Sequence, residues 1–201
     1  GKKIARGLRK TPQLYGPLKQ AFFQPFLLVY GTKGGKEHSQ NLLQRAVHFA
    51  NLWWWRASGY TRIVADTEVN EEMMQNYHLI LFGGPESNYL TARWMPSLPI
   101  QLGKDFVKIG EKTYPGTDFS LQMIYPNPEN PGKFIVILGG QSNPVSDLSS
   151  VSFGILFSGA GLPDFLLYRA EEVKKFGWAG VTAAGFFDSS WSLSPTLLYL
   201  R

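Results

Sequence analysis

One stretch near the start of the chain, residues 26–55, constrains the fold more than any other part of the sequence. Phe26–Tyr30 is a short continuous apolar run, which is typical of a strand buried on both faces. A glycine-rich turn at residues 31–35 follows it, and apolar residues then recur three and four positions apart, the period of an amphipathic helix. Strand, glycine turn and helix in this order are the first half of a βαβ unit. The apolar residues of the helical pattern are Leu42, Leu43, Ala46, Val47, Ala50, Trp53 and Trp54.

The same alternation continues to about residue 89. We expect a second strand at Arg62–Ala65 and a third at His78–Phe82, because both are short runs rich in apolar residues. Between them, Asn70 is followed by two carboxylates. An Asn side chain can cap a first helical turn, and acidic groups there favour the positive end of the helix dipole. A second glycine turn, residues 83–88, then leads into a helix that reaches about residue 95.

The character of the sequence changes after residue 98. Three short segments, 99–102, 106–109 and 112–114, are separated by glycine-containing turns and predict an inserted β-hairpin or meander. Residues 119–125 alternate in polarity and can pair with the apolar run 134–138. The further expectations are a proline-rich surface turn at 126–132 that is not a strand, a helix at 148–157, and strands at 164–168 and 180–187.

Helices that alternate with strands first, and antiparallel pieces later, predict an α/β fold. We expect three layers around a mixed, mainly parallel sheet of the flavodoxin or Rossmann type, with an inserted β-hairpin. The 201 residues suffice for one core, which predicts a single domain at residues 15–191. Residues 1–14 are expected to be a basic linker or extension, and residues 192–201 a tail.

The positive charge of the chain is concentrated at its start. The net charge is +5, and Lys2, Lys3, Arg6, Arg9 and Lys10 supply that much within ten residues that contain no acidic group. A groove that tracks phosphates needs basic residues spread along one face with aromatic residues between them. We therefore expect no nucleic-acid partner. No run of about 18 apolar residues occurs, so we also expect no membrane span.

A serine nucleophile is the first catalytic possibility. Gly140, Gln141 and Ser142 begin like the G-x-S-x-G nucleophile elbow, but Pro144 replaces the final glycine. In an α/β-hydrolase the His of the triad follows the Ser, whereas every histidine of this chain precedes Ser142. The three histidines are His38, His48 and His78. We therefore expect no catalytic residue in this chain.

Metal and cofactor chemistry finds little support in the sequence. The chain has no cysteine, which excludes disulfides, thiolate metal ligands and a cysteine nucleophile. The spacing of the histidines matches no metal-binding motif. We therefore expect neither a metal nor a cofactor.

The carboxyl ends of parallel strands are where ligands of such sheets bind. The glycine turn after the first strand lies there, and free amide groups at a helix N-terminus favour an anion. The turn departs from a P-loop in spacing, and Glu37 stands where Ser or Thr would bind magnesium. Anion binding and a plain strand-to-helix turn both stay open. The candidate ligand-binding residues are Gly31, Thr32, Lys33, Gly34, Gly35, Lys36, Asp66, Thr67, Gly83, Gly84, Glu86, Asn88, Gln141 and Ser142.

Three consecutive tryptophans, Trp53, Trp54 and Trp55, lie near the end of the first helical pattern. Successive residues of a helix point in different directions, so the three side chains cannot share one face. We expect two of them to pack in the core and the third to contact another domain or a partner protein.

Seven spaced segments carry a resemblance to a known family. In this order they resemble the domain that follows the catalytic α/β-hydrolase domain in large bacterial proteins of the prolyl-oligopeptidase-like or esterase-like kind. The resemblance covers roughly residues 15–191. The segments are YGPLKQAF (15–22), FLLV (26–29), ADTEV (65–69), HLILFGGPESN (78–88), GEKTYP (110–115), IYPNP (124–128) and AGFFD (184–188).

The resemblance implies a non-catalytic accessory domain of an exported serine hydrolase. The nucleophile, acid and histidine would belong to the α/β-hydrolase domain of the same polypeptide, and this domain would pack on it or assist it. The alternative is an autonomous binding domain or enzyme that holds an anionic small molecule between the 31–36 and 83–88 loops. An exposed apolar patch favours the first hypothesis, and a concave pocket at the glycine loops favours the second.

Overall fold

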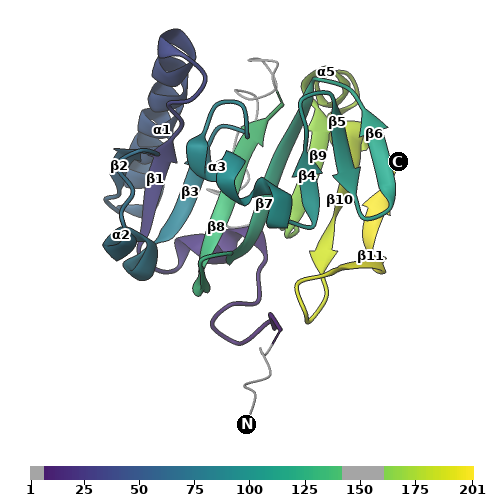
Figure 1. Cartoon of the computed structure of the whole chain (residues 1–201), viewed down its shortest axis with the longest axis horizontal. Helices are drawn as coiled ribbons and strands as arrows, with labels where there is room; N and C mark the ends of the chain where they lie inside the picture. Colours follow the sequence, from purple (N-terminus) through teal and green to yellow (C-terminus); the bar gives the residue numbers. More distant parts are fainter. Residues whose placement is uncertain (1–6, 142–160) are drawn as a thin grey trace.

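The computed structural model describes residues 7–141 and 161–201 (Figure 1). Within these ranges, a large sheet contains eight strands in the order β11-β10-β9-β7-β8-β3-β1-β2, and a small sheet contains β4-β5-β6. The strands of the large sheet are β1 (Phe26–Tyr30), β2 (Arg62–Ala65), β3 (His78–Phe82), β7 (Phe119–Asn127), β8 (Asn130–Gly140), β9 (Phe165–Arg169), β10 (Val181–Phe187) and β11 (Leu193–Leu200). Those of the small sheet are β4 (Ile100–Leu102), β5 (Phe106–Ile109) and β6 (Lys112–Pro115).

One half of the large sheet has the parallel arrangement that the sequence predicts. Strand β1 pairs in parallel with β2 and β3, and β3 pairs in parallel with β8. Helices α1 (Lys36–Ala57) and α2 (Glu71–Asn76) make the connections from β1 to β2 and from β2 to β3. The expected cap at Asn70 is present, since its side chain accepts a hydrogen bond from the backbone N–H of Met73 at 2.9 Å.

The expectation of a mainly parallel sheet is wrong for the other half. Strands β7, β8, β9, β10 and β11 all pair antiparallel with one another along the sheet order. Strands β7 and β8 are separated by two residues, 128 and 129, and so short a turn can join only antiparallel neighbours. The large sheet of the described chain is therefore mixed, with three parallel and four antiparallel pairings.

The turn expected at residues 126–132 is much shorter than the sequence suggests. Strand β7 extends through Pro126, which lies opposite Phe134, and the pairing shifts register immediately after it. A proline cannot donate a ladder hydrogen bond, and such a register shift is where a strand tolerates it. The prolines therefore mark an irregular strand end as well as a turn.

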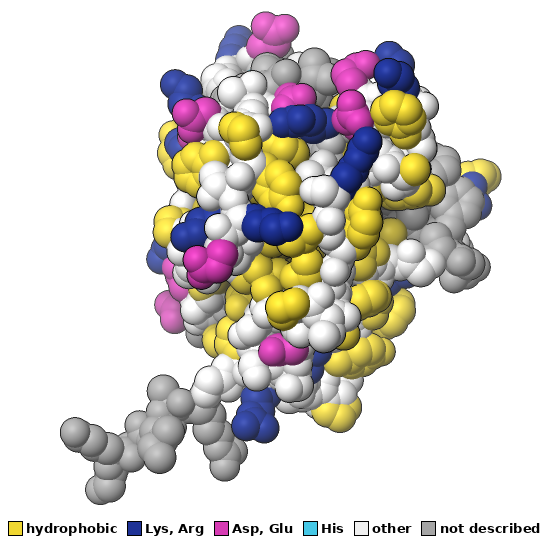
Figure 2. Space-filling view, turned by 90° about the vertical axis from the view of Figure 1, so that its right-hand side faces the viewer, with side chains coloured by type: hydrophobic (Ala, Val, Ile, Leu, Met, Phe, Trp, Pro, Cys, Tyr) yellow, Lys and Arg dark blue, Asp and Glu magenta, His cyan; other side chains and the backbone are white. Residues whose placement is uncertain are grey.

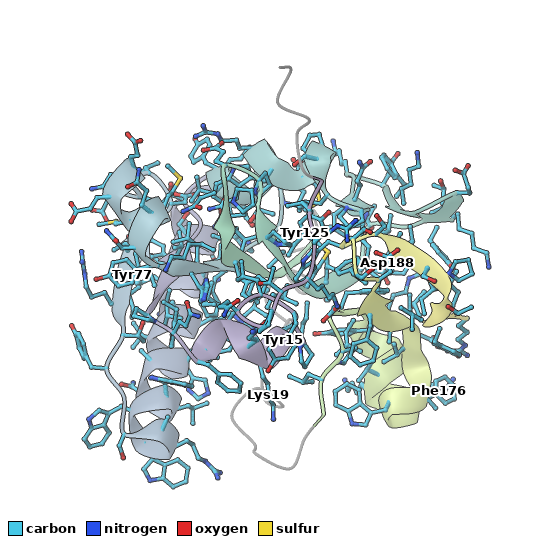
Figure 3. The ribbon with its side chains drawn as sticks, turned by 90° about the horizontal axis from the view of Figure 1, so that it is seen from below. Tyr15, Lys19, Tyr77, Tyr125, Phe176 and Asp188 are labelled. Atoms are coloured by element: carbon cyan, nitrogen blue, oxygen red, sulfur yellow. The ribbon has the colours of Figure 1, made fainter. Side chains whose placement is uncertain are left out.

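Helices cover both faces of the large sheet. Figures 1 and 3 place α1 and α5 (Ala170–Phe176) on one face, and α3 (Tyr89–Trp94) with the small sheet on the other. The short helices are η1 (Leu18–Phe22), η2 (Met95–Ser97) and η4 (Gly177–Gly180). One continuous hydrophobic core runs through these layers, from Leu18 to Trp191.

Both ends of the described chain belong to this fold. The backbone N–H of Lys10 donates to the carbonyl of Ser189 at 2.8 Å, so the segment expected as a linker lies against the domain. Residues 192–201, expected as a tail, contain the edge strand β11. The helix expected at 148–157 and the candidate Ser142 lie outside the described residues.

Candidate functional site

The two glycine loops meet at the carboxyl ends of β1 and β3, as the parallel arrangement requires. The backbone N–H of Gly31 donates to Phe82 at 3.0 Å, and that of Lys33 donates to Ser87 at 3.0 Å. A Cβ atom at Gly31 would collide with the backbone of Ser87. This close approach explains why glycine follows β1, and it brings residues 31–36 and 83–88 together.

Asp66 lies between the two loops. Its carboxylate accepts hydrogen bonds from the Thr32 hydroxyl at 2.6 Å, the Thr32 N–H at 3.1 Å and the Tyr89 N–H at 2.6 Å. The side chain is buried, with 3% of the residue exposed. Two backbone N–H groups and a hydroxyl around an oxyanion are what an anion site offers a ligand. Here the protein's own carboxylate fills that place.

Lys33 and Asn88 also pair within the protein. The Lys33 ammonium donates to the carbonyl of Pro85 at 2.6 Å, which directs its charge to the neighbouring loop. Asn88 caps α3 by accepting from the N–H groups of Leu90 and Thr91, both at 3.0 Å. Of the remaining candidates, Gly34, Gly35, Lys36, Thr67 and Glu86 are exposed at the rim of the loops.

Glycines 84 and 140 bring β3 and β8 into close contact at this edge. A Cβ atom at Gly84 would overlap the carbonyl of Gly140, and one at Gly139 would overlap the backbone of Gly83. These glycines therefore allow the strand ends to approach each other. The neighbouring loops leave no room here for a ligand between the two backbones.

Gln141 has a structural role. Its side-chain oxygen accepts from the Phe119 N–H at 3.1 Å, and its amide nitrogen donates to the carbonyls of Gly103 and Phe106 at 2.8 and 2.9 Å. The side chain is buried and joins the small sheet to the large one. It is thus occupied by the fold and is not directed at a ligand.

Among the described residues, no group of three or more His, Asp or Glu side chains could hold a metal ion. His78 is buried at the start of β3, and its Nδ1 accepts a hydrogen bond from the Phe134 N–H at 2.8 Å. Burial, together with the positive charge of Lys133, lowers the pKa of His78 to about 4. The imidazole is therefore neutral near pH 7, with its proton on Nε2.

A partly buried ion pair that the sequence does not reveal holds the amino-terminal segment in place. The Lys10 ammonium lies 2.6 Å from the Asp164 carboxylate, which also accepts from the Phe187 N–H at 2.9 Å. The same ammonium lies 4.8 Å from the ring centroid of the buried Trp191. Burial raises the pKa of Asp164, while the hydrogen bonds from Lys10 and Phe187 oppose that rise.

The opposite end of the sheet, at the amino ends of β1–β3, carries exposed aromatic side chains. We define the aromatic corner as Phe23, Trp54, Trp55 and Tyr60, which are 74%, 67%, 66% and 87% exposed. A groove of about 460 Å³ lies beside them, lined by Trp53 and Tyr77 among others. Figure 3 views this end of the molecule and labels Tyr77.

The expected distribution of the three tryptophans is reversed. Only Trp53 packs inward, where its ring lies 5.0 Å from that of Phe26, and Trp54 and Trp55 are exposed. Helix α1 has 22 residues and is about 33 Å long, whereas the five residues of β1 span about 17 Å. The last turn of α1, which follows Trp53, therefore extends past the sheet and has little surface to cover.

Comparison with models of known protein families and with curated proteins finds no match to this chain. None of the helices in residues 7–141 and 161–201 combines the length and hydrophobicity that crossing a membrane requires.

Proposed function

We propose that this domain is a non-catalytic accessory module of a larger bacterial serine hydrolase of the peptidase or esterase type. The catalytic α/β-hydrolase domain would be its partner within the same polypeptide, and neither nucleic acid nor a cofactor would be bound. The resemblance of seven spaced segments supports the kind of parent protein. The aromatic corner supports the mode of action, which is packing on another domain.

The exposed aromatic corner is the observation that carries the proposal. Trp and Tyr side chains are among the residues that contribute most to protein interfaces, because each buries a large, rigid apolar surface. Four large aromatic side chains, each more than 60% exposed, lie around one end of the molecule. Contact with a partner domain would remove this surface from water.

The alternative hypothesis, an anion-binding domain, receives less support from the geometry. The amides and the hydroxyl that an anion would need already bind Asp66, and the Lys33 ammonium binds Pro85. A ligand anion would have to displace a buried carboxylate of the same charge. It stays a hypothesis for the exposed rim of the loops, at Lys36.

The proposal extends to the fold type. Strands β2, β1, β3 and β8 with the helices on both faces support a three-layer core related to flavodoxin or Rossmann folds. Strands β7 and β9–β11 would then be an antiparallel extension of that core.

Binding to the hydrolase domain tests the proposal. The affinity of this domain for the separately expressed catalytic domain would be measured by isothermal titration calorimetry. We expect the double variant Trp54→Ala/Trp55→Ala to bind at least about tenfold more weakly, since truncation of interface tryptophans commonly costs 2 kcal/mol or more. Trp178→Ala is the matched control, because Trp178 is 70% exposed and lies outside the aromatic corner.

Two results would contradict the proposal. One is that wild-type domain and catalytic domain do not bind each other. The other is that the double variant and the Trp178→Ala control bind with the same affinity as the wild type, which would remove the aromatic corner from the interface.

A further inference from the structure

A polar pocket lies between the small sheet and the antiparallel half of the large sheet. Its volume is about 390 Å³, which is in the range of small-molecule sites. Figure 2 faces this side of the molecule and shows basic and acidic side chains close together in its upper part. The residues that line the pocket include Tyr114, Phe119, Arg169, Glu172, Thr182 and Arg201.

The guanidinium of Arg169 is held in place by its surroundings. Its Nη2 donates to the Pro115 carbonyl at 2.9 Å, and its Cζ lies 4.2 Å from the centroid of the Phe119 ring. Oδ1 of Asp118 lies 3.0 Å from Nε as an ion pair, although the N–H is not aligned for a hydrogen bond. Within the described chain no group accepts from Nη1. The protein therefore fixes this guanidinium and leaves donors on it for a ligand.

A second guanidinium, that of Arg201, lines the same pocket. Its Nη1 lies 3.3 Å from Oε2 of Glu172, and the two side chains are 50% and 41% exposed. Water screens an ion pair as exposed as this one, so the pair is weak. The side chains that line the pocket carry two positive charges, from Arg169 and Arg201, and one negative charge, from Glu172.

Tyr114 supplies a further donor in the wall of the pocket. Its hydroxyl is buried and has no hydrogen-bond partner among residues 7–141 and 161–201. Burial raises the pKa of Tyr114, so the hydroxyl keeps its proton near pH 7. A buried donor without a partner costs free energy, and an acceptor on a ligand that reaches this hydroxyl would recover it.

We propose that this pocket binds the carboxylate of a small molecule that has a single negative charge and an apolar body. A planar carboxylate matches the planar donor set of a fixed arginine. The surplus of one positive charge in the lining suits a monoanion, and Glu172 would repel the second charge of a phosphate dianion. Pro115 and the rings of Tyr114 and Phe119 offer apolar surface to the rest of the ligand.

This pocket is separate from the glycine loops and from the aromatic corner. At the glycine loops the donors already bind Asp66, whereas here Nη1 of Arg169 has no acceptor in the described chain. A carboxylate is the product that peptide and ester hydrolysis share. The inference does not depend on the proposed parent protein, however, because residues of this chain alone form the pocket.

Titration with benzoate, followed by NMR of the backbone amides, tests both the binding and its place. Benzoate has one planar carboxylate on an apolar ring, and a ligand of its size binds with a dissociation constant of about 1–10 mM at ordinary efficiency. We expect saturable shifts at the amides of Tyr114, Phe119 and Thr182. Benzamide, which has a similar shape without the charge, should bind about tenfold more weakly. Inorganic phosphate should cause no saturable shift at these amides.

Two pairs of variants distinguish a ligand site from residues with a structural role alone. Arg201→Ala should weaken benzoate binding about tenfold, and Arg62→Ala, the same charge change at an exposed position of β2, should leave it unchanged. Glu172→Gln should strengthen binding about threefold, because it removes a negative charge from the lining and releases Arg201. Glu171→Gln is its control, since Glu171 is the preceding residue of α5, is 79% exposed and does not line the pocket.

The proposal is overturned if benzoate at about 20 mM causes no saturable shift around the pocket, or if benzamide binds as tightly as benzoate. It is also overturned if Arg201→Ala binds benzoate as tightly as Arg62→Ala does. The same holds if Glu172→Gln binds benzoate no more tightly than Glu171→Gln, because the charge of the lining would then have no part in binding.

Discussion

Protonation of His78 should make the stability of this domain depend on pH in a predictable way. The pKa of the buried imidazole is about 4, whereas an unfolded chain has a His pKa of about 6.5. At pH values between these two, the unfolded state binds more protons than the folded state, so the free energy of unfolding falls as the pH falls. The full loss, completed below pH 4, is about 3 kcal/mol.

The contribution of His78 is best measured above the pH at which most carboxylates titrate. Between pH 7 and pH 5 the His78 contribution alone amounts to a loss of about 2 kcal/mol. The structural reason is direct. Nδ1 accepts from the Phe134 N–H, so a proton added to Nδ1 would face another donor, and the cation would lie among apolar groups such as the Phe134 ring, 5.2 Å away.

Urea unfolding at pH 7 and pH 5 measures this loss. His78→Asn keeps an acceptor near the Nδ1 position but cannot be protonated, so it should be less stable at pH 7 and should lose about 2 kcal/mol less on acidification. The exposed His48 provides the control, since His48→Asn should retain the wild-type loss. Equal pH dependence in wild type and His78→Asn would refute the argument.

Three other outcomes follow from the same structure. Asp66→Ala should lower the free energy of unfolding in urea by about 2–3 kcal/mol, because it leaves buried N–H donors without their acceptor. Phosphate should then raise the melting temperature of the variant and not that of the wild type. Equal effects of phosphate on both would contradict the role given to Asp66. Lys10→Met should cost about 3 kcal/mol or more, because it leaves the Asp164 carboxylate buried without its cation; a loss under 1 kcal/mol would mean that water or another group replaces the ammonium. Gln141→Ala should cost about 1–3 kcal/mol and increase hydrogen exchange in the small sheet, and unchanged exchange at β4–β6 would contradict a role in joining the two sheets.

The elements of the first half follow from the sequence because each has a local signal. Strands β2 and β3 begin and end where their apolar runs do, and Asn70 caps α2 as its position before two carboxylates suggests. The glycine turns also predict where the chain crosses the carboxyl edge of the sheet. These signals depend only on residues that are neighbours in the sequence, and so they can be recognised without the tertiary structure.

Strand direction and the outer strands do not follow from local signals. Strand β11 contains a proline, and its apolar and polar residues alternate poorly, so the sequence of Leu193–Leu200 does not predict an edge strand. The sequence predicts that β7 and β8 pair, but the surrounding prolines conceal how short the turn between them is. No local signal indicates the directions of β9, β10 and β11. Apolar runs of similar length do not indicate which strands pair in parallel and which pair antiparallel.

The sequence predicts which segments meet at this edge of the sheet, but not how their polar groups pair. The sequence places Asp66 beside both glycine loops, and the structure brings all three together. Asp66 binds the second loop because the N–H of Tyr89, at the start of α3, lies close to its carboxylate. No sequence motif indicates this contact. The ion pair of Lys10 and Asp164 joins residues 154 positions apart, and long-range pairs of this kind leave no pattern in a single sequence.

We propose that this chain acts beside a hydrolase domain that carries the catalytic residues. The most direct measurement is the complete reading frame of the native gene together with the intact mass of the native protein. We predict a polypeptide in which an α/β-hydrolase domain, with a G-x-S-x-G elbow and a histidine after it, adjoins this domain. A native protein with no such domain would contradict the claim.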